Sequence, residues 1–588
     1  MCCCKKGDPD TRGFDKDPDG NFAIDTESRK CTDLLCVLVF IVFWIGFIAV
    51  GAMAALGGDR YVVSNGFQID GRICGLTEDA TPHKGAGVKF DKVILPGPLW
   101  ASETAIWSTT ATNYTVCTDK CPDKKGALFN VNLYDSKTKK MTEKKMYAVY
   151  STKLVKVGTL QTCFYQTNGT AHTATLQDAI NGVVDAAPGI AIGAVVCILM
   201  IGVFFVIVRK CMGFLIWTAI SLVAIGLLGM AGIFFQSSTN EDHSADQQNS
   251  YRSFGIIMIV LFVIYCAVMC FLRSRIKFAI MMMEEVTHAL EDMKTMFLLP
   301  PFKFLVIAIF YILWIAIAGG LATAGKFQDA PNATALTETV NGKEWEVKPQ
   351  EMAYDEGLQN AVYFHMFAAI WVNAFLIAMM NFMVASSFAQ WYFAPRENGK
   401  KTLVKPVAEA FRLAWTKHIG TMVFGSLIVA IATAVKHIVD YMLEQAKKQS
   451  GNNRAVKLVA CVMKCLTRCI ESCLKYISTQ AYIFTAIHGT NFWSSCVSLF
   501  KFISANPLRI GVAQSLGRIV VGLGRNFVLC FTMLITFLLM TYVEPMKTQI
   551  NSPYLALFVV FAIAFVMCVV AFEVFGMGMD TLIMCFIA

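Results

Sequence analysis

The side chains best suited to hold a small molecule lie in one long apolar stretch of this chain, residues 361–389. Within it Trp371 is about one helical turn from Phe367 and Phe375, and Asn373 is one of the few polar residues. Ring faces of this kind attract a quaternary ammonium group, each contact contributing roughly 0.5 to 2 kcal/mol, while an amide could bind a hydroxyl group of the same molecule. The alternative is that these aromatic side chains pack against other helices or face lipid.

An aromatic cage around a cation needs rings from more than one segment. We expect Trp217 or Tyr265 to supply a second ring, and Glu573 or Asp580 to supply negative charge or to exchange a proton. Ionisable groups inside a membrane mark a pathway, because placing them in lipid is costly. The predicted substrate-binding residues are therefore Trp371, Asn373, Trp217, Tyr265, Glu573 and Asp580.

The composition indicates that these residues belong to a membrane protein. Of 588 residues, 56% are apolar and 16% are charged, whereas about 25% are charged in an ordinary soluble domain. The apolar residues gather into runs of roughly twenty, the length that crosses a hydrocarbon core of about 30 Å. This excludes a soluble enzyme, a fibre and a disordered chain. The net charge of +9, from 51 Lys and Arg against 42 Asp and Glu, is most simply a signal of membrane orientation, so the expected partner is the bilayer and not a nucleic acid.

Ten apolar segments predict an all-α polytopic membrane protein with about ten transmembrane helices. The first is longer than the apolar core of a cleavable signal peptide, so we expect it to remain as an anchor. The segment at 470–490 is the least apolar of the ten. The predicted spans are 34–56, 189–208, 212–235, 254–272, 301–322, 361–389, 418–438, 470–490, 519–543 and 553–575.

Basic residues in short connections predict the orientation. Arg209 follows the second span, Arg273 follows the fourth, and Lys400 and Lys401 follow the sixth. Loops rich in Lys and Arg stay on the cytoplasmic side. We therefore expect both termini in the cytoplasm, and the plasma membrane as the location.

The same orientation places residues 57–188 outside the cell as one large loop. This loop has four cysteines in an oxidising compartment, which predicts two disulfides with three possible pairings, or else four free thiols. All three sequons for N-glycosylation also fall outside, two in this loop and one in residues 323–360. The disulfide candidates are Cys74, Cys117, Cys121 and Cys163, and the glycosylation candidates are Asn113, Asn168 and Asn332.

One stretch conflicts with this simple alternation. Residues 444–457 are basic, with Lys447, Lys448 and Arg454, yet alternation places them outside. Either the helix that follows spans the membrane with a polar surface facing the bundle, or two half-spans both return to the cytoplasm. Broken spans are tolerated only where their backbone faces protein or a wet cavity.

The predicted domain organisation follows from these spans. Two amphipathic segments are expected at the cytoplasmic surface, and the first of them is either a lever or lid or a plain connector. The predicted parts are a cytoplasmic tail at 1–33, the first helix at 34–56, the large extracellular loop at 57–188, and helices 2 to 10 at 189–588, with the amphipathic segments near 273–300 and 491–518.

No motif in the sequence predicts catalysis. The chain has no Walker loop, no His-Glu-x-x-His and no Gly-x-Ser-x-Gly, and its eight histidines are scattered. Four cysteines from Cys461 to Cys473 recur every four residues on one segment, whereas a zinc site needs ligands converging from more than one element. We expect no enzymatic activity, no metal and no cofactor, so transport is the default class.

Short motifs spread along the whole chain are specific when taken together. They include Phe43-Trp-Ile-Gly46, Gly71-Arg-Ile-Cys-Gly75, His365-Met-Phe with Trp371-Val-Asn373, Ala389-Gln-Trp-Tyr392, Lys417-His-Ile-Gly420, Phe424-Gly-Ser-Leu427, Ala481-Tyr-Ile483 and Ala486-Ile-His-Gly-Thr-Asn-Phe492. With these motifs the chain resembles the choline transporter-like proteins, solute carrier family 44.

The resemblance implies a monomeric ten-span carrier of choline, and in some members of ethanolamine or thiamine pyrophosphate, with a glycosylated first loop. One motif departs from the family pattern. The family's Tyr-Glu-Met-x-x-Asp reads Phe575-Gly-Met-Gly-Met-Asp580 here, so Gly576 stands at the place of its Glu. Glu573 lies three residues earlier, and the identity of the substrate is what this departure puts in question.

The predicted function is transport of choline, with ethanolamine as a related substrate, by facilitated diffusion or proton-linked exchange. A cell interior negative by about 100 mV contributes roughly 2.3 kcal/mol to the uptake of a cation, enough for about fifty-fold accumulation without sodium. The alternatives are a carrier of another organic cation or of thiamine pyrophosphate, a channel or lipid scramblase, and a scaffold that transports nothing. A phosphate carrier needs a basic pocket, and Arg525 is the most notable cation within the spans. The alternative for Arg525 is that its side chain only extends to the membrane surface.

Overall fold

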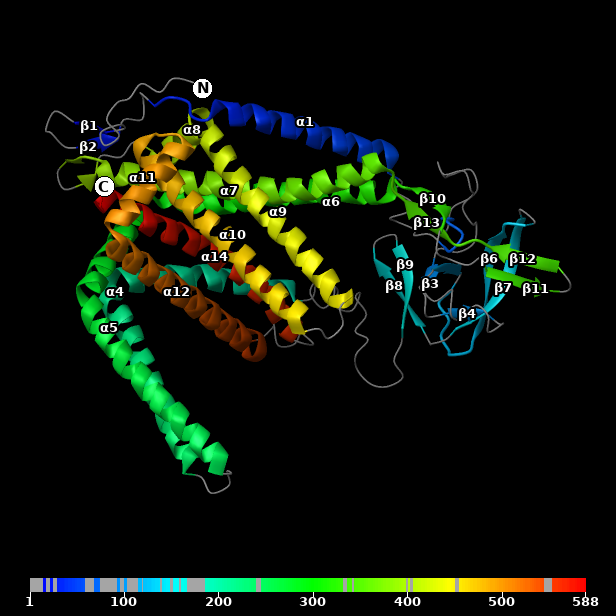
Figure 1. Cartoon of the computed structure of the whole chain (residues 1–588), viewed down its shortest axis with the longest axis horizontal. Helices are drawn as coiled ribbons and strands as arrows, with labels where there is room; N and C mark the ends of the chain where they lie inside the picture. Colours follow the sequence, from blue (N-terminus) through cyan, green and yellow to red (C-terminus); the bar gives the residue numbers. More distant parts are fainter. Residues whose placement is uncertain are drawn as a thin grey trace.

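Long apolar runs fold as helices in a membrane because a helix satisfies its backbone hydrogen bonds without water. In its described residues, the computed structural model contains nine helices long and apolar enough to cross a membrane. With a tenth, more polar helix they form a bundle, and a strand-rich domain lies at one end (Figure 1). The predicted all-α polytopic bundle is confirmed. Its long helices are α1 (Leu34–Gly57), α4 (Ala187–Ser238), which counts as two of the ten, α5 (Ala245–Asp292), α6 (Leu299–Thr323), α7 (Glu356–Phe393), α9 (Ile419–Gln449), α10 (Arg454–His488), the more polar helix, α12 (Pro507–Tyr542) and α14 (Pro553–Ile587).

The structure describes most, but not all, of the chain. The described residues are 14–16, 22–24, 29–58, 68–74, 93–95, 100–102, 115–118, 120–137, 140–148, 152–157, 160–165, 186–239, 245–330, 336–340, 343–397, 400–401, 405–449, 454–543 and 553–587.

Both chain termini lie at one end of the bundle, which we call the termini end, and the strand-rich domain lies at the other, the domain end (Figure 1). Short elements cover the termini end. They include the predicted amphipathic segment near 491–518, which the structure divides into a separate helix and the first turns of α12. These short elements are β1 (Phe14–Lys16), β2 (Phe22–Ile24), η2 (Lys294–Leu298), β14 (Arg396–Glu397), β15 (Lys400–Lys401), α8 (Pro406–Thr416) and α11 (Phe492–Ala505).

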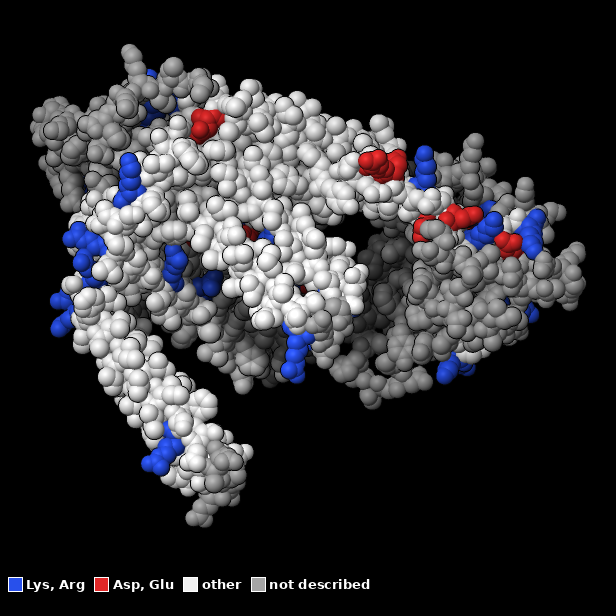
Figure 2. All heavy atoms as spheres, viewed as in Figure 1, with Lys and Arg blue, Asp and Glu red and all other residues white. Residues whose placement is uncertain are grey.

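Helices α4 and α5 form a hairpin that projects from the bundle (Figure 1). α4 contains both predicted spans at 189–208 and 212–235, separated by non-helical torsions at Cys211. α5 contains the span at 254–272 and continues through most of the segment predicted as amphipathic, to Asp292. Large apolar side chains along this hairpin are exposed. In a membrane these surfaces face lipid, and Figure 2 shows the adjoining face of the bundle as largely uncharged.

The basic stretch at 444–457 joins two full helices. α9 and α10 run side by side and antiparallel, and α9 ends and α10 begins away from the termini end (Figure 1). α10 is one continuous helix of 35 residues. An unbroken helix is what the first of the two alternatives predicts.

Ion pairs with α9 explain how α10 tolerates its charges inside the bundle. The side chain of Glu471 is 7% exposed and accepts hydrogen bonds from Lys436 Nζ at 2.9 Å and Lys475 Nζ at 2.7 Å. Thr433 Oγ1 donates to the same carboxylate at 3.0 Å. A carboxylate held by two ammonium groups and a hydroxyl group avoids most of the cost of an unpaired charge.

The strand-rich domain is built from two separate loops of the chain. One runs from α1 to α4 and the other from α6 to α7, and they join where Gln350 N donates to Ile69 O at 2.8 Å and Ser136 N donates to Glu346 O at 2.9 Å. The strands were not predicted. They are β3 (Val93–Leu95), β4 (Trp100–Ser102), β5 (Val116–Thr118), β6 (Leu128–Asp135), β7 (Lys140–Ala148), β8 (Thr152–Val157), β9 (Leu160–Tyr165), β10 (Lys326–Asp329), β11 (Leu336–Val340), β12 (Lys343–Val347) and β13 (Gln350–Ala353). They pair as β5-β3-β9-β8, β4-β7-β6, β10-β13 and β11-β12.

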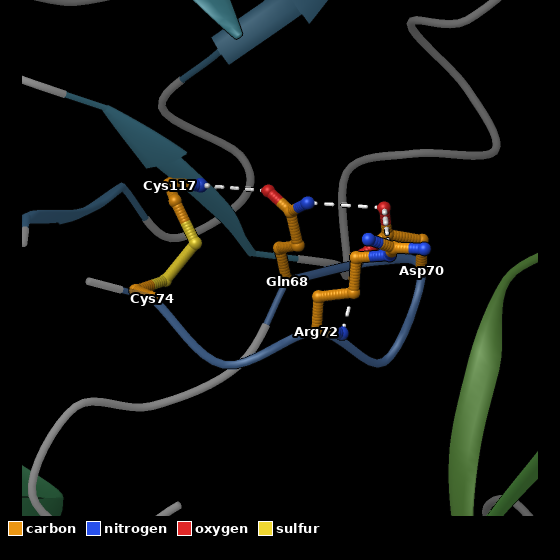
Figure 3. The surroundings of a disulfide bond; sticks show 5 residues. All are labelled: Gln68, Asp70, Arg72, Cys74 and Cys117. Carbon is orange, nitrogen blue, oxygen red and sulfur yellow. Dashed lines mark hydrogen bonds and ion pairs between the residues drawn. A yellow bond between two sulfur atoms is a disulfide. The ribbon is translucent and has the colours of Figure 1, made fainter. Parts of the chain in front are cut away.

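Two disulfides secure this domain, as predicted. The pairing is Cys74 with Cys117 and Cys121 with Cys163. Beside the first bond, Gln68 accepts from the backbone of Cys117 at 3.4 Å and donates to Asp70 at 3.0 Å (Figure 3). The glycosylation candidates Asn113, Asn168 and Asn332 lie outside the described residues.

The segment just before α1 forms hydrogen bonds with the end of α10 and the start of α11, at the termini end. Arg29 donates to the carbonyl oxygen of Ala486, near the end of α10, at 2.8 Å. The Asp33 carboxylate accepts from Phe492 N, at the start of α11, at 3.0 Å, and from Thr421 Oγ1 at 2.7 Å. These charges complement the helix dipoles at the two helix ends. Residues 29–33 therefore fix the start of α1 against α9, α10 and α11.

His418 lies under this segment, in the turn between α8 and α9 and before the spanning part of α9. It is fully buried, and its Nδ1 is 3.1 Å from Thr32 Oγ1. Burial, together with the positive charges of Arg29 and Lys417, lowers the pKa of His418 to about 3. The histidine is therefore neutral at physiological pH.

Substitution of Glu471 tests the pairing of α10 with α9. Glu471→Ala leaves Lys436 without its partner, so we expect a loss of stability on the order of 3 kcal/mol. Glu444→Ala removes a carboxylate that is 63% exposed and pairs with Lys464 at 3.4 Å, and should cost less than about 1 kcal/mol. Thermal unfolding of the purified protein measures both, and equal shifts would contradict the assignment.

The neutral His418 predicts a pH dependence of stability. An unfolded histidine binds a proton near pH 6.5 and the folded one near pH 3, so stability is lost as the pH falls between these values. From pH 7 to pH 5 this one group accounts for about 2 kcal/mol. In unfolding midpoints measured across that range, His418→Gln should flatten the dependence, and His288→Gln, at an exposed position, should leave it as in the wild type. An unchanged slope in His418→Gln would refute the assignment.

Candidate functional site

Trp371 lies in an aromatic cluster between α7 and α1. Its ring centroid is 4.5 Å from that of Phe43, 5.5 Å from that of Phe40 and 5.9 Å from that of Phe367. The side chain is buried, and within the described part of the chain its indole N–H has no partner. Its ring contacts in that part of the chain are all with phenylalanines, so this face of Trp371 packs against α1 and its own helix.

Nearby, His365 links α7 to α6. Its ring stacks on Trp314 with centroids 4.8 Å apart, and its Nε2 donates to Trp314 O at 3.1 Å. Trp314 Nε1 donates back to His365 O at 2.9 Å. This reciprocal pair joins two helices. Asn373, two residues beyond Trp371, is partly buried.

The other predicted rings lie in the α4–α5 hairpin. The Tyr265 hydroxyl donates to Ile220 O at 3.1 Å and so ties α5 to α4. Trp217 is partly buried against the main core. The structure therefore brings neither ring into contact with Trp371.

The two predicted carboxylates on α14 have different surroundings. Glu573 is paired with Lys303 of α6, at 2.6 Å and 2.9 Å from its two oxygens. Asp580 lies two turns further along α14, beside a cavity. Asp580 lines this cavity, and Glu573 is not among its lining residues.

The cavity is a groove of about 280 Å³ between α12 and α14, close to the size typical of a small-molecule site. Glycines widen it, because a glycine adds no side chain where two helices lie close together. Gly576, at the place of the family's Glu, is one of them, and a Cβ there would come no nearer than 3.8 Å to Val521. The lining residues are Gln514, Gly517, Arg518, Val521, Gly522, Arg525, Gly576, Met579 and Asp580.

A chain of hydrogen bonds leads from α10 and α12 to Asp580. Tyr476 OH donates to Gln514 Oε1 at 2.8 Å, Gln514 Nε2 donates to Gln480 Oε1 at 3.2 Å, and Gln480 Nε2 donates to Asp580 Oδ2 at 3.1 Å. Gln480 and Gln514 are both buried. Each donor in the chain points toward the carboxylate, so the negative charge of Asp580 is stabilised without an ion pair in this network.

Two cations line the same groove. Arg518 lies with its guanidinium carbon 5.6 Å from the ring centroid of Tyr476, and Arg525 lies 5.8 Å from that of Phe565. Arg525 Nε is buried without a hydrogen-bond partner among the described residues. The groove can therefore offer a carboxylate to a cation and guanidinium groups to an anion.

Sequence reasoning found Asp580 and Arg525 but missed the residues that lead to Asp580. Gln480, Gln514 and Tyr476 come from two other helices, and Arg518 precedes Arg525 by seven residues, two turns on one face. A signal was present, because glutamines in an apolar helix need partners inside the bundle. Over the part of the chain that the structure covers, no cluster of three or more His, Cys, Asp or Glu side chains could hold a metal ion.

Known proteins resemble the chain along most of its length. A family profile described as plasma-membrane choline transporter matches residues 256–588. The chain is 24% identical to choline transporter-like protein 2 of Homo sapiens, over 95% of this chain and 91% of that protein. It is 24% identical to choline transporter-like protein 5 of Macaca fascicularis, over 99% and 93% respectively. Choline transporter-like protein 2 of Dictyostelium discoideum is 23% identical, over 95% and 91%.

The profile covers more than half of the chain, including both helices that line the groove and every residue of the hydrogen-bond chain to Asp580. The relatives are named as transporters, and they align over nearly the whole sequence. The chain is an integral membrane protein, and it belongs to the choline transporter family.

Proposed function

We propose that this protein transports choline, or a closely related amino alcohol such as ethanolamine, across the plasma membrane, with both of its own termini in the cytoplasm. The observation that carries the proposal is the Asp580 groove, a cavity with a partly buried carboxylate in a chain of the choline transporter family. The names of the relatives support the substrate class. The protein acts as a monomer in this proposal, since one chain supplies the whole groove.

Two polar groups of the groove, Asp580 and Gln514, bind the substrate in this proposal. The carboxylate of Asp580 attracts the positive charge of the substrate. A quaternary ammonium group has no N–H to donate, so it is held by charge and not by a hydrogen bond. The hydroxyl group of choline binds the amide of Gln514, which also lines the groove. This assignment replaces the predicted cage of Trp371 with Trp217 or Tyr265, because the rings around Trp371 are already packed together.

The membrane potential is a sufficient driving force. An interior negative by about 100 mV favours entry of a monovalent cation by roughly 2.3 kcal/mol. Facilitated diffusion therefore needs no coupling ion. Proton-linked exchange is the variant in which Asp580 takes up a proton when the substrate leaves.

Neutralising Asp580 tests this assignment. Asp580→Asn keeps an oxygen to accept from Gln480 but removes the charge, so we expect choline uptake into proteoliposomes to fall roughly tenfold or more, a loss of at least about 1.4 kcal/mol of binding. Asp440→Asn neutralises a carboxylate of α9 that is 3.8 Å from Lys464, and should leave the choline concentration for half-maximal uptake unchanged. Normal choline uptake by Asp580→Asn would refute the role of Asp580.

A second function, transport of an organic phosphate such as thiamine pyrophosphate, is favoured by one specific observation. Arg518 and Arg525 both line the groove, and a buried nitrogen of Arg525 has no partner in the described structure. Guanidinium groups bind phosphate oxygens strongly. Under this alternative the anion, and not a cation, occupies the groove.

Substitution of Arg525 separates the two functions. If the cargo is an organic phosphate, thiamine pyrophosphate raises the unfolding midpoint of the wild type, and Arg525→Gln abolishes that shift. If the cargo is choline, Arg525→Gln keeps or strengthens stabilisation by choline, because a repelling charge is gone. The thermal shifts of the wild type and of Arg525→Gln with both compounds therefore decide between the two substrates.

A further inference from the structure

A second aromatic site lies at the termini end, in the motif Ala389-Gln-Trp-Tyr392 that the groove does not use. Lys401 folds back over the end of α7, with Nζ 3.7 Å from the ring centroid of Trp391 and 5.7 Å from that of Tyr392. The same ammonium group donates to Trp391 O at 2.7 Å and to Tyr392 O at 3.0 Å. Two ring faces and two carbonyl oxygens therefore surround one organic cation.

Two carboxylates of α5 interact with the rings of this site. Trp391 Nε1 donates to Asp292 Oδ2 at 2.8 Å, which fixes the orientation of the indole ring. Glu285, two turns earlier on α5, interacts electrostatically with the Tyr392 hydroxyl. Trp391 is buried, and the end of a helix carries partial negative charge. Without Lys401 these groups would leave a negatively polarised pocket with no cation in it.

We propose that Trp391, Tyr392 and the carbonyl oxygens at the end of α7 form a binding site for an organic ammonium group, which Lys401 fills in this conformation. The site is separate from the groove, because its residues come from α7, α5 and the β14–β15 hairpin. Its groups suit a primary ammonium, which can donate to the two carbonyls, and its ring faces also suit a methylated one. A free ammonium compound that reaches this end of α7 must displace Lys401.

A plain helix cap accounts for part of the geometry. Lysine side chains often donate to the last carbonyls of a helix. A cap alone, however, requires neither a ring face at 3.7 Å nor an indole oriented by a carboxylate. The two interpretations differ in what happens when the lysine is removed.

Refilling the site with a free ammonium compound is the test. Lys401→Ala removes three carbons and the ammonium group, which n-propylammonium restores as a separate molecule. We expect n-propylammonium to raise the unfolding midpoint of this variant saturably, by about 1 °C at ten times its Kd. The neutral isostere 1-propanol should have no such effect, and the wild type, whose site is filled, should respond much less. Lys405→Ala, at an exposed position of the same connection, should respond like the wild type.

A double variant measures how much the Trp391 ring contributes to binding of n-propylammonium. Adding Trp391→Leu to Lys401→Ala should abolish the effect of n-propylammonium. Equal responses of Lys401→Ala to n-propylammonium and 1-propanol, or equal responses of Lys401→Ala and the wild type, would overturn the proposal. These readouts concern stability only, so they do not depend on which substrate the protein transports.

A milder substitution guards against a variant that does not fold. Lys401→Met keeps a chain of similar length and lacks little more than the ammonium group itself. Ammonium chloride should then stabilise Lys401→Met more than sodium chloride does at the same ionic strength. Equal stabilisation by the two salts in a folded Lys401→Met would contradict the site.

Discussion

The hydrocarbon core of a membrane cannot solvate a polar group, so each polar side chain inside the bundle must find its partner in the protein. The described structure meets this constraint with long-range pairs. Glu471 joins α10 to α9 through Lys436, and Glu573 joins α14 to α6 through Lys303. The pair of Glu471 with Lys436 allows the most polar of the long helices, α10, to lie within the bundle.

By the same constraint, a polar side chain inside the bundle that lacks hydrogen-bond partners indicates a place for water or a ligand. In the groove between α12 and α14, Asp580 accepts from one amide, and Arg525 Nε has no partner among the described residues. Such groups are stable only where water or a ligand reaches them. The groove therefore combines a cavity with a partly buried carboxylate. Because glycine stands at 576, Asp580 is the one carboxylate among its lining residues.

Periodicity and composition predicted the helices well, since hydropathy depends on the local sequence alone. They also predicted two disulfides, because four cysteines in one outer loop are an even number. The sequence could not predict how helices face one another. The ring neighbours of Trp371 include Phe40 and Phe43 from the first helix of the chain, and spacing along one helix does not reveal them. Gln480 and Gln514 were missed because only their approach across two helices reveals that they lead to Asp580. The short strands of the outer domain were missed because they pair across two distant loops and carry no long apolar run.

The central claim is that the transported substrate occupies the groove beside Asp580. The most direct measurement uses Gly576→Cys, since a Cβ at this position has room, with its nearest neighbour at 3.8 Å. The rate at which a small cationic methanethiosulfonate modifies the introduced thiol, followed by mass spectrometry of the peptide that carries it, reports occupancy of the groove. Our account predicts that choline slows this modification, with half of the effect at the concentration that half-saturates uptake. An unchanged modification rate in a variant that still transports choline would show that the substrate binds elsewhere.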